Sequence, residues 1–188
     1  MKKRALTLVE LIVASVLLGI TILGITRGSV FFIEQIGANL ERQHIYTQIN
    51  YAIDDMKLRC MGARSITAGY TLNPGGTRSN LDFTGERDIY NVTPDITTDD
   101  RCYRYFIHSA GDLRLRTCAS CPCNAALNEE TLVDGRFSPS LSFSHTVGDE
   151  PNYITVTVGA NTSKSTVGLS NVISKTEGLR FWFVYIVQ

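Results

Sequence analysis

The first third of the chain carries two hydrophobic patterns, one after the other. Residues 6–26 are apolar almost without interruption, and Glu10 is their only charged residue. From residue 30 to about residue 63, apolar residues instead recur every three or four positions with charged residues between them, which is the period of an amphipathic helix. No proline occurs between Thr7 and Arg64. The pattern predicts one helix from about Thr7 to Arg64, apolar all round in its first half and amphipathic in its second.

Beyond this helix the period changes to the two-residue alternation of β-strands. Turn-forming residues separate short segments of this kind, and the alternation is clearest around residues 141–143 and 154–158. We expect strands at 80–83, 88–92, 102–107, 113–118, 140–144, 153–158 and 179–187. An antiparallel β-sheet laid on the amphipathic half of the helix would give an α+β domain. The final apolar run is too short to cross a membrane, so we expect it to form a buried strand.

The apolar segment is long enough to cross a bilayer once. As a helix, residues 6–26 would reach about 31 Å. Lys2, Lys3 and Arg4 precede the segment and no comparable short basic loop follows it, which predicts a cytoplasmic N-terminus and an external domain. An ordinary secretory signal is cut after its apolar run, but no small-x-small site with a polar start follows Ile25. The segment is therefore expected to stay on the protein.

The presence of the charged residue Glu10 within this apolar segment requires an explanation. An ionised carboxylate in hydrocarbon costs about 3 kcal/mol even on the mild insertion scales, so it is interpreted as functional. No Lys, Arg or His lies between Arg4 and Arg27 to serve as a counter-ion. We expect its partner on another molecule. Such a pair would fix an axial register, because an unpaired buried carboxylate is penalised far more than a paired one.

The start of the chain resembles the leader of type IV prepilins and type II secretion pseudopilins. The resemblance rests on the basic residues 2–4, the small residue Ala5, and the sequence Leu6-Thr-Leu-Val-Glu10-Leu that opens the apolar helix. It implies cleavage between Ala5 and Leu6 by a prepilin peptidase, N-methylation of Leu6, and pairing of Glu10 with the new terminal ammonium of a neighbouring subunit. The family commonly has glycine and phenylalanine where this chain has Ala5 and Leu6.

This resemblance implies four regions. They are a leader peptide at 1–5, a transmembrane and filament-core helix at 6–27, an amphipathic helix at 28–64, and a β-rich periplasmic or extracellular domain at 65–188. Segments between Leu81-Asp-Phe and Leu141-Ser-Phe-Ser resemble, more loosely, the J-class minor pseudopilins and related minor pilins. The expected location is the bacterial inner membrane, followed by the filament or cell surface.

The resemblance also implies a function and partners. We expect a non-enzymatic minor pilin or pseudopilin that primes filament assembly or sits at the tip. Other pilins or pseudopilins, the prepilin peptidase, the assembly platform of the inner membrane and membrane lipid would be its partners. Filaments for secretion, twitching, adhesion and DNA uptake all use this leader. The alternative is an uncleaved signal anchor that carries a periplasmic binding or redox module with a cysteine-rich loop.

Five cysteines agree with an oxidising compartment. Cys102 and Cys118 flank two predicted strands joined by a turn, so folding the hairpin brings them opposite each other and predicts a disulfide between them. Cys60 with Cys121 or Cys123 would form a second bond and tie the helix to the domain. An odd count means at least one free or intermolecular thiol if no metal is bound.

Metal binding is a weaker interpretation of the same residues. Cys118, Cys121 and Cys123 have the spacing of a metal clasp, with Cys102 as a fourth sulfur, but an oxidising compartment favours disulfides. Calcium is a second candidate ion. Asp95, Asp99 and Asp100 are weak candidates for it, because their segment is acidic but lacks the spacing of an EF-hand loop.

Charge and motif content favour a structural role. The chain has 18 basic and 18 acidic residues, and loss of residues 1–5 would make the remainder mildly acidic. Arg101, Arg104, Arg114 and Arg116 alternate with acidic residues, which favours a solvated hairpin face, and no specific nucleic-acid partner is predicted. No nucleophile motif, phosphate-binding loop or spaced histidine pair is found, so no enzymatic activity is expected.

Overall fold

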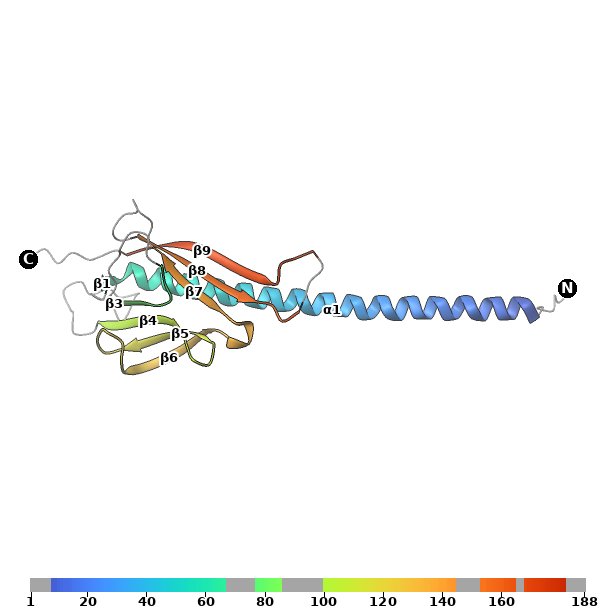
Figure 1. Ribbon diagram of the computed structural model, residues 1–188, viewed down its shortest axis with the longest axis horizontal. Coiled ribbons are helices and arrows are strands. Elements are labelled where there is room, and N and C mark those ends of the chain that lie inside the picture. Colours follow the sequence, from blue (N-terminus) through green and yellow to red (C-terminus); the bar gives the residue numbers. More distant parts are fainter. Residues whose placement is uncertain (1–7, 67–76, 86–99, 145–152, 165–167, 182–188) are drawn as a thin grey trace, which may run out of the picture. The chain divides into compact units, whose positions relative to one another are not determined.

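The computed structural model describes residues 8–66, 77–85, 100–144, 153–164 and 168–181 (Figure 1). Within these residues it has one α-helix, α1 (Leu8–Met61), one 3-10 turn, η1 (Gly135–Phe137), and nine β-strands. The strands are β1 (Ala63–Ile66), β2 (Thr77–Arg78), β3 (Leu81–Gly85), β4 (Arg101–Ile107), β5 (Leu113–Cys118), β6 (Ala126–Val133), β7 (Ser140–Ser144), β8 (Tyr153–Asn161) and β9 (Val172–Arg180).

The long N-terminal helix is confirmed. α1 continues for 54 residues, and it ends where the Gly62 amide bonds to the Arg59 carbonyl and β1 begins. The chain divides into two compact units, residues 1–40 and 41–188, so α1 contributes its first part to one unit and its last part to the other.

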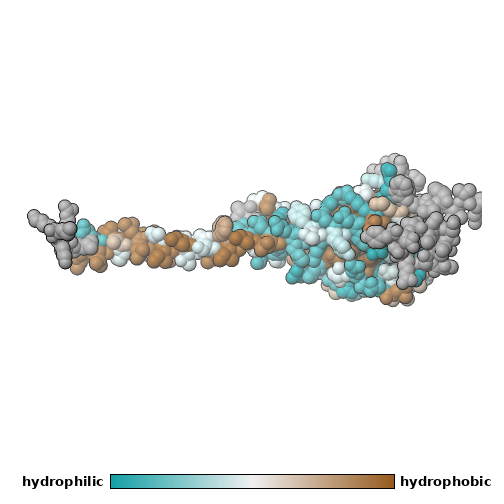
Figure 2. Space-filling view, turned by 180° about the vertical axis from the view of Figure 1, so that it is seen from behind, coloured by the Kyte–Doolittle hydropathy of each residue, from teal (hydrophilic) through white to brown (hydrophobic). Residues whose placement is uncertain are grey.

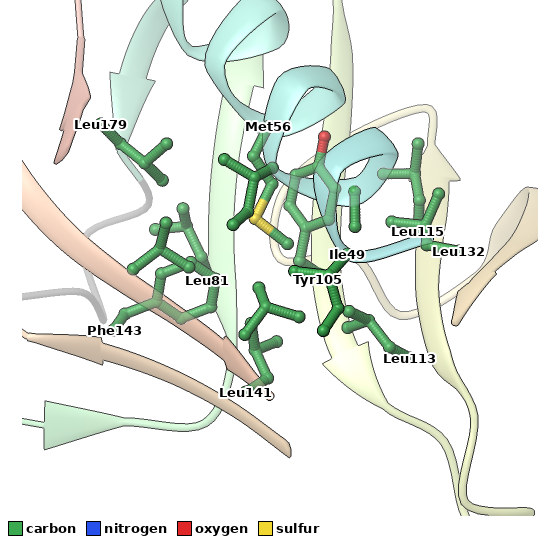
Figure 3. Packing of buried hydrophobic residues seen from close by; sticks show 14 of the residues in the cluster. Ile49, Met56, Leu81, Tyr105, Leu113, Leu115, Leu132, Leu141, Phe143 and Leu179 are labelled. Carbon is green, nitrogen blue, oxygen red and sulfur yellow. The ribbon is translucent and has the colours of Figure 1, made fainter. Parts of the chain in front are cut away.

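The second unit is an α+β domain, as predicted. Its strands form two antiparallel sheets, one in the order β1-β3-β4-β5-β6 and the other in the order β2-β7-β8-β9. The part of α1 from Ile45 to Cys60 packs its apolar face into a core that the inner faces of both sheets complete (Figure 3). Ile49, Met56, Tyr105 and Phe143 come from these three layers and are almost fully buried. Burial of each such side chain contributes about 1.5–3 kcal/mol.

The β4–β5 hairpin has the predicted turn and register. Ile107 lies opposite Leu113 and Cys102 opposite Cys118. In the turn, the Gly111 amide bonds to the His108 carbonyl at 2.8 Å, and Gly111 has a φ of +93°, which a residue with a side chain adopts only with strain.

Four strands differ from the sequence prediction: β1, β2 and β6 were not predicted, and β9 was misplaced. β9 begins at Val172 and not at residue 179, because its charged inward positions find polar partners on α1: Lys57 Nζ lies 3.0 Å from Glu177 Oε2, and Lys175 Nζ donates to Asn50. β6 was missed for a similar reason, since Glu129 is paired with Arg114 and Arg116 of β5 and Glu130 accepts from the Tyr51 hydroxyl of α1. The predicted strand at 88–92 and residues 182–187 lie outside the described residues.

Candidate functional site

The first part of α1 is an exposed apolar surface. We call residues 8–26 the apolar segment. Every one of its side chains is exposed, and Figure 2 shows apolar residues along this part of the helix. Among the described residues, α1 is the one helix that is long and apolar enough to cross a membrane. A surface of this kind is stable in lipid or against other apolar helices and unstable in water.

The hydroxyl side chains of the apolar segment are satisfied within the helix. The hydroxyls of Thr21 and Thr26 each donate to the carbonyl four residues earlier at 2.8 Å, and Ser15 donates to the Ile12 carbonyl. In hydrocarbon an unsatisfied donor would cost several kcal/mol, whereas the acceptors of these hydroxyls are backbone carbonyls of the same helix. The segment can therefore enter a dry environment without leaving these donors unpaired.

Three glycines leave exposed backbone on the first part of α1. A Cβ added at Gly19, Gly24 or Gly28 would meet nothing within 4 Å. Glycine weakens a helix in water, but between helices in an apolar medium small residues allow two backbones to approach closely. These positions are compatible with packing against a second helix.

Glu10 lies in the first turn of α1 and is the only charge of the apolar segment. The positive end of the helix dipole favours a carboxylate at this position. Ala5 and Leu6, the predicted processing positions, lie outside the described residues, so cleavage stays a prediction.

The predicted disulfide between Cys102 and Cys118 is wrong, although the two residues are opposite each other as expected. The bonds are Cys102–Cys121 and Cys118–Cys123, with Cα–Cα distances of 5.2 and 5.4 Å. After β5 the chain turns back, so that the loop brings one further cysteine to each of the two strand cysteines. The hairpin alone suggested the wrong pairing because it took no account of this loop.

The predicted bond from Cys60 to Cys121 or Cys123 is also wrong. Cys60 is unpaired and fully buried in the core beneath the sheets, whereas the four bonded cysteines form a separate cluster. Cys102 faces away from the core because it alternates with Tyr103 along β4. Burial raises the pKa of the Cys60 thiol well above its usual range, which makes this sulfur unreactive in the folded domain.

The structure excludes the cysteines as metal ligands but does not test the aspartates. The four cysteines of the clasp are bonded to one another as disulfides and offer no thiolate. Within the described part of the chain, no three His, Cys, Asp or Glu residues are grouped to hold an ion. Asp95 and Asp99 lie outside that part, and Asp100 immediately precedes β4. Calcium binding by these aspartates stays a prediction.

A set of polar contacts attaches the last turns of α1 to β4, and the sequence analysis did not predict it. The Tyr105 hydroxyl donates to Asp55 Oδ2 at 2.7 Å, and Arg59 Nε donates to both oxygens of the same carboxylate. The Arg59 guanidinium lies over the ring of Tyr103 at 4.8 Å. Burial, together with the Asp55 charge, raises the pKa of Tyr105 well above its usual value. The spacing of Asp55 and Arg59, four residues apart on a predicted helix, was the available signal.

The outward side of the five-stranded sheet carries paired charges. We call Asp82, Arg104, Asp112, Arg114, Arg116 and Glu129 the charged face. Arg104 and Arg116 are directly opposite each other in β4 and β5, yet each pairs with a carboxylate of the flanking strand: Arg104 with Asp82 and Arg116 with Glu129. Arg114 contacts both Asp112 and Glu129. Each arginine thus neutralises a carboxylate of the same domain.

No known protein family, curated protein or solved structure matches the chain. The fold and the helix nevertheless define a class: a disulfide-bonded α+β domain with an N-terminal helix of membrane-spanning length.

Proposed function

We propose that this chain is a minor pilin or pseudopilin, a non-enzymatic structural subunit of a type IV pilus or type II secretion filament. One observation carries the proposal: an apolar helix of membrane-spanning length follows a basic leader and has Glu10 as its only charge. The protein would prime filament assembly or sit at the tip. In the membrane, the N-terminus lies in the cytoplasm and the domain in the periplasm.

The proposed role of Glu10 follows from the cleavage that the leader implies. Cutting between Ala5 and Leu6 creates an ammonium group about one helical turn from Glu10. Glu10 then pairs with the ammonium group of a neighbouring subunit, and both charges lie among apolar side chains. Because leaving either charge unpaired there is strongly unfavourable, the pair selects one axial position between subunits.

Transfer of the subunit from membrane to filament is energetically feasible for such a helix. A bundle of apolar helices is about as apolar as lipid, so the segment exchanges one dry environment for another. The internal hydrogen bonds of Thr21 and Thr26 remain intact in both environments. Gly19 and Gly24 present bare backbone at which a neighbouring helix can approach.

The domain contributes a firm attachment for the helix. Asp55, Arg59 and Tyr105 hold α1 against β4, and Ile49 and Ile53 are fully buried in the core. The two disulfides are suited to an oxidising periplasm. A displacement of the last turns of α1 would therefore carry the domain with it, which is what a filament subunit requires.

The Glu10 role is tested by replacing this residue in cells that lack the unmodified chain. We expect Glu10→Ala to enter the membrane normally and to be absent from sheared filaments, measured by immunoblot of the membrane and filament fractions. Glu34→Ala is the matched control, because Glu34 is an exposed carboxylate of α1 beyond the apolar segment. It should be recovered in filaments like the unmodified chain.

Two results would count against this proposal. Recovery of Glu10→Ala in filaments at the level of Glu34→Ala would refute the register role. Absence of the unmodified chain from every sheared filament fraction, with full recovery in the membrane, would favour the uncleaved signal anchor.

A further inference from the structure

The outward side of the four-stranded sheet carries a regular array of hydroxyl groups. Strands β7, β8 and β9 pair in register (Figure 1), and every second residue of each strand points away from the core. Three rows of three residues result, which we call the hydroxyl face: Ser140, Gly159 and Ser174; Ser142, Thr157 and Thr176; Ser144, Thr155 and Gly178.

The hydroxyl face is neutral and shallow. Its members are serine, threonine and glycine, with no charged or large apolar side chain among the nine. All seven serine and threonine side chains are exposed or partly exposed, while the alternate positions, such as Phe143 and Val156, are buried in the core. From strand spacings the array covers about 10 Å by 13 Å. The charged face of the other sheet, with its six ionised residues, is its opposite in character.

Three of these hydroxyls have no hydrogen-bond partner among the described residues. The Thr157 and Thr176 hydroxyls share a hydrogen bond of 2.9 Å. The hydroxyls of Ser142, Thr155 and Ser174 bond to no other described residue. A hydroxyl both donates and accepts, so the array can meet ligand O–H groups in either direction.

An aromatic ring borders one end of the hydroxyl face. Tyr153 lies across Gly178: a Cβ at residue 178 would be 2.1 Å from the Tyr153 oxygen and 2.6 Å from its Cε2. Only glycine therefore allows the ring to occupy this place. Tyr153 is partly exposed, so the ring offers a flat apolar surface beside the hydroxyl rows. Arg180, the cross-strand partner of Tyr153, lies at the rim.

The chemistry of the hydroxyl face discriminates between partners. Nucleic acids and other polyanions are bound through clusters of Lys and Arg, which the nine positions lack. The centres of protein interfaces are enriched in aromatic residues and Arg and depleted in Ser, the reverse of this composition. An uncharged ligand that is itself rich in hydroxyls is complementary in charge and in hydrogen bonding.

We propose that the hydroxyl face binds an uncharged polysaccharide. The serine and threonine hydroxyls bond to sugar hydroxyls, and the Tyr153 ring packs against the apolar C–H side of one sugar ring. The dimensions of the face suit a few consecutive sugar units. This activity goes beyond the proposed assembly role and does not depend on it.

The test is retention of the full chain, in detergent micelles, on insoluble polysaccharides. Cellulose, chitin and cross-linked amylose serve as neutral probes, and alginate beads as the acidic one. We expect retention on at least one neutral polymer and none on alginate. The double variant Thr157→Val with Thr176→Val keeps the β-branched shape and removes two hydroxyls, so it should bind about tenfold more weakly. Thr131→Val, at an exposed threonine of the other sheet, should bind like the unmodified chain.

Circular dichroism first establishes that the variants are folded. Retention on none of the neutral polymers would overturn the proposal, and so would equal binding by the double variant. Self-association that the double variant abolishes, without any retention on a neutral polymer, would assign the face to a second copy of the chain instead.

Discussion

The two parts of α1 are built on the same backbone but differ in their surroundings. From Leu8 to Glu34 every side chain is exposed, and nearly all are apolar up to Arg27. From Glu41 to Met61 the helix has one buried face, with Ile45, Ile49, Ile53 and Met56 fully enclosed. The difference teaches that helix formation and burial are separate properties. Local preferences form the helix throughout, but only the second part finds a core in its own chain.

This comparison assigns different roles to identical residue types. An isoleucine in the second part contributes to domain stability by filling a close-packed core. An isoleucine in the first part contributes nothing to that core, and its stabilisation depends on lipid or on other helices. Variants at matched positions in the two parts can separate these roles.

The largest effect is expected from a charge placed in each part. Ile53→Asp should unfold the domain, because an unpaired buried carboxylate costs more than about 4 kcal/mol. Ile22→Asp should leave the domain folded and weaken membrane insertion by about 3 kcal/mol. Urea unfolding of the detergent-solubilised chain, followed by circular dichroism, and membrane fractionation measure the two effects. If Ile22→Asp lowered the unfolding midpoint as much as Ile53→Asp, the division of α1 would be wrong.

Removal of the disulfides should destabilise the second unit by a smaller amount. Chain-entropy arguments predict a loss of about 3 kcal/mol for the Cys102–Cys121 bond and about 2 kcal/mol for the shorter loop of Cys118–Cys123. The measurement is urea unfolding of each Ser/Ser double variant against the unmodified chain. Peptide mapping without reduction should recover these two linkages, with Cys60 alkylated only after unfolding. A linked Cys102–Cys118 peptide would contradict the described pairing.

Alkaline pH should lower the free energy of unfolding of the second unit in two stages. Burial raises the folded-state pKa of Cys60 and, with the Asp55 charge, that of Tyr105. When the pKa of a group is higher in the folded state than in the unfolded state, the group's contribution to the free energy of unfolding is complete below the unfolded-state pKa. It is lost progressively as the pH rises above that value. The decline should begin near pH 8.5 for the thiol and increase near pH 10 for the phenol. Unfolding midpoints across this range measure it: Cys60→Ala should remove the first stage and Tyr105→Phe should reduce the second.

The smallest effect is expected at a partly exposed ion pair of the second unit. Glu177→Gln removes the partner of Lys57 and Lys175, but solvent screens all three groups. The unfolding midpoint should stay nearly unchanged. A loss as large as that of a disulfide variant would show that the contact between β9 and α1 depends on charge and not on the apolar core.

Much of the fold was predictable because its signals are local. The helix, the β4–β5 hairpin with its register, and β7 follow from periodicity and turn residues in adjacent sequence. β9 was misplaced because Lys175 and Glu177 break the apolar alternation, and their partners Asn50 and Lys57 are distant in sequence. Division of the strands into two sheets likewise depends on long-range packing that no local pattern encodes.

Within the candidate site, the apolar helix could be predicted from the sequence, but the pairing of the cysteines could not. Glu10 and the apolar segment could be recognised from composition alone. The disulfide pairing could not, because Cys102 and Cys118 are opposite each other and only the path of the following loop assigns each to another partner. The hydrogen bond between Tyr105 and Asp55 was not predicted because the sequence does not indicate which strand packs against the end of α1.

The central claim is that the apolar segment is retained while a short leader is removed. The most direct test is the intact mass and N-terminal peptide of the chain, purified from membranes that contain a prepilin peptidase. The account predicts loss of residues 1–5 and a mature protein that begins at Leu6, with one added methyl group. A chain that keeps Met1, or one that has lost the whole apolar segment, would contradict it.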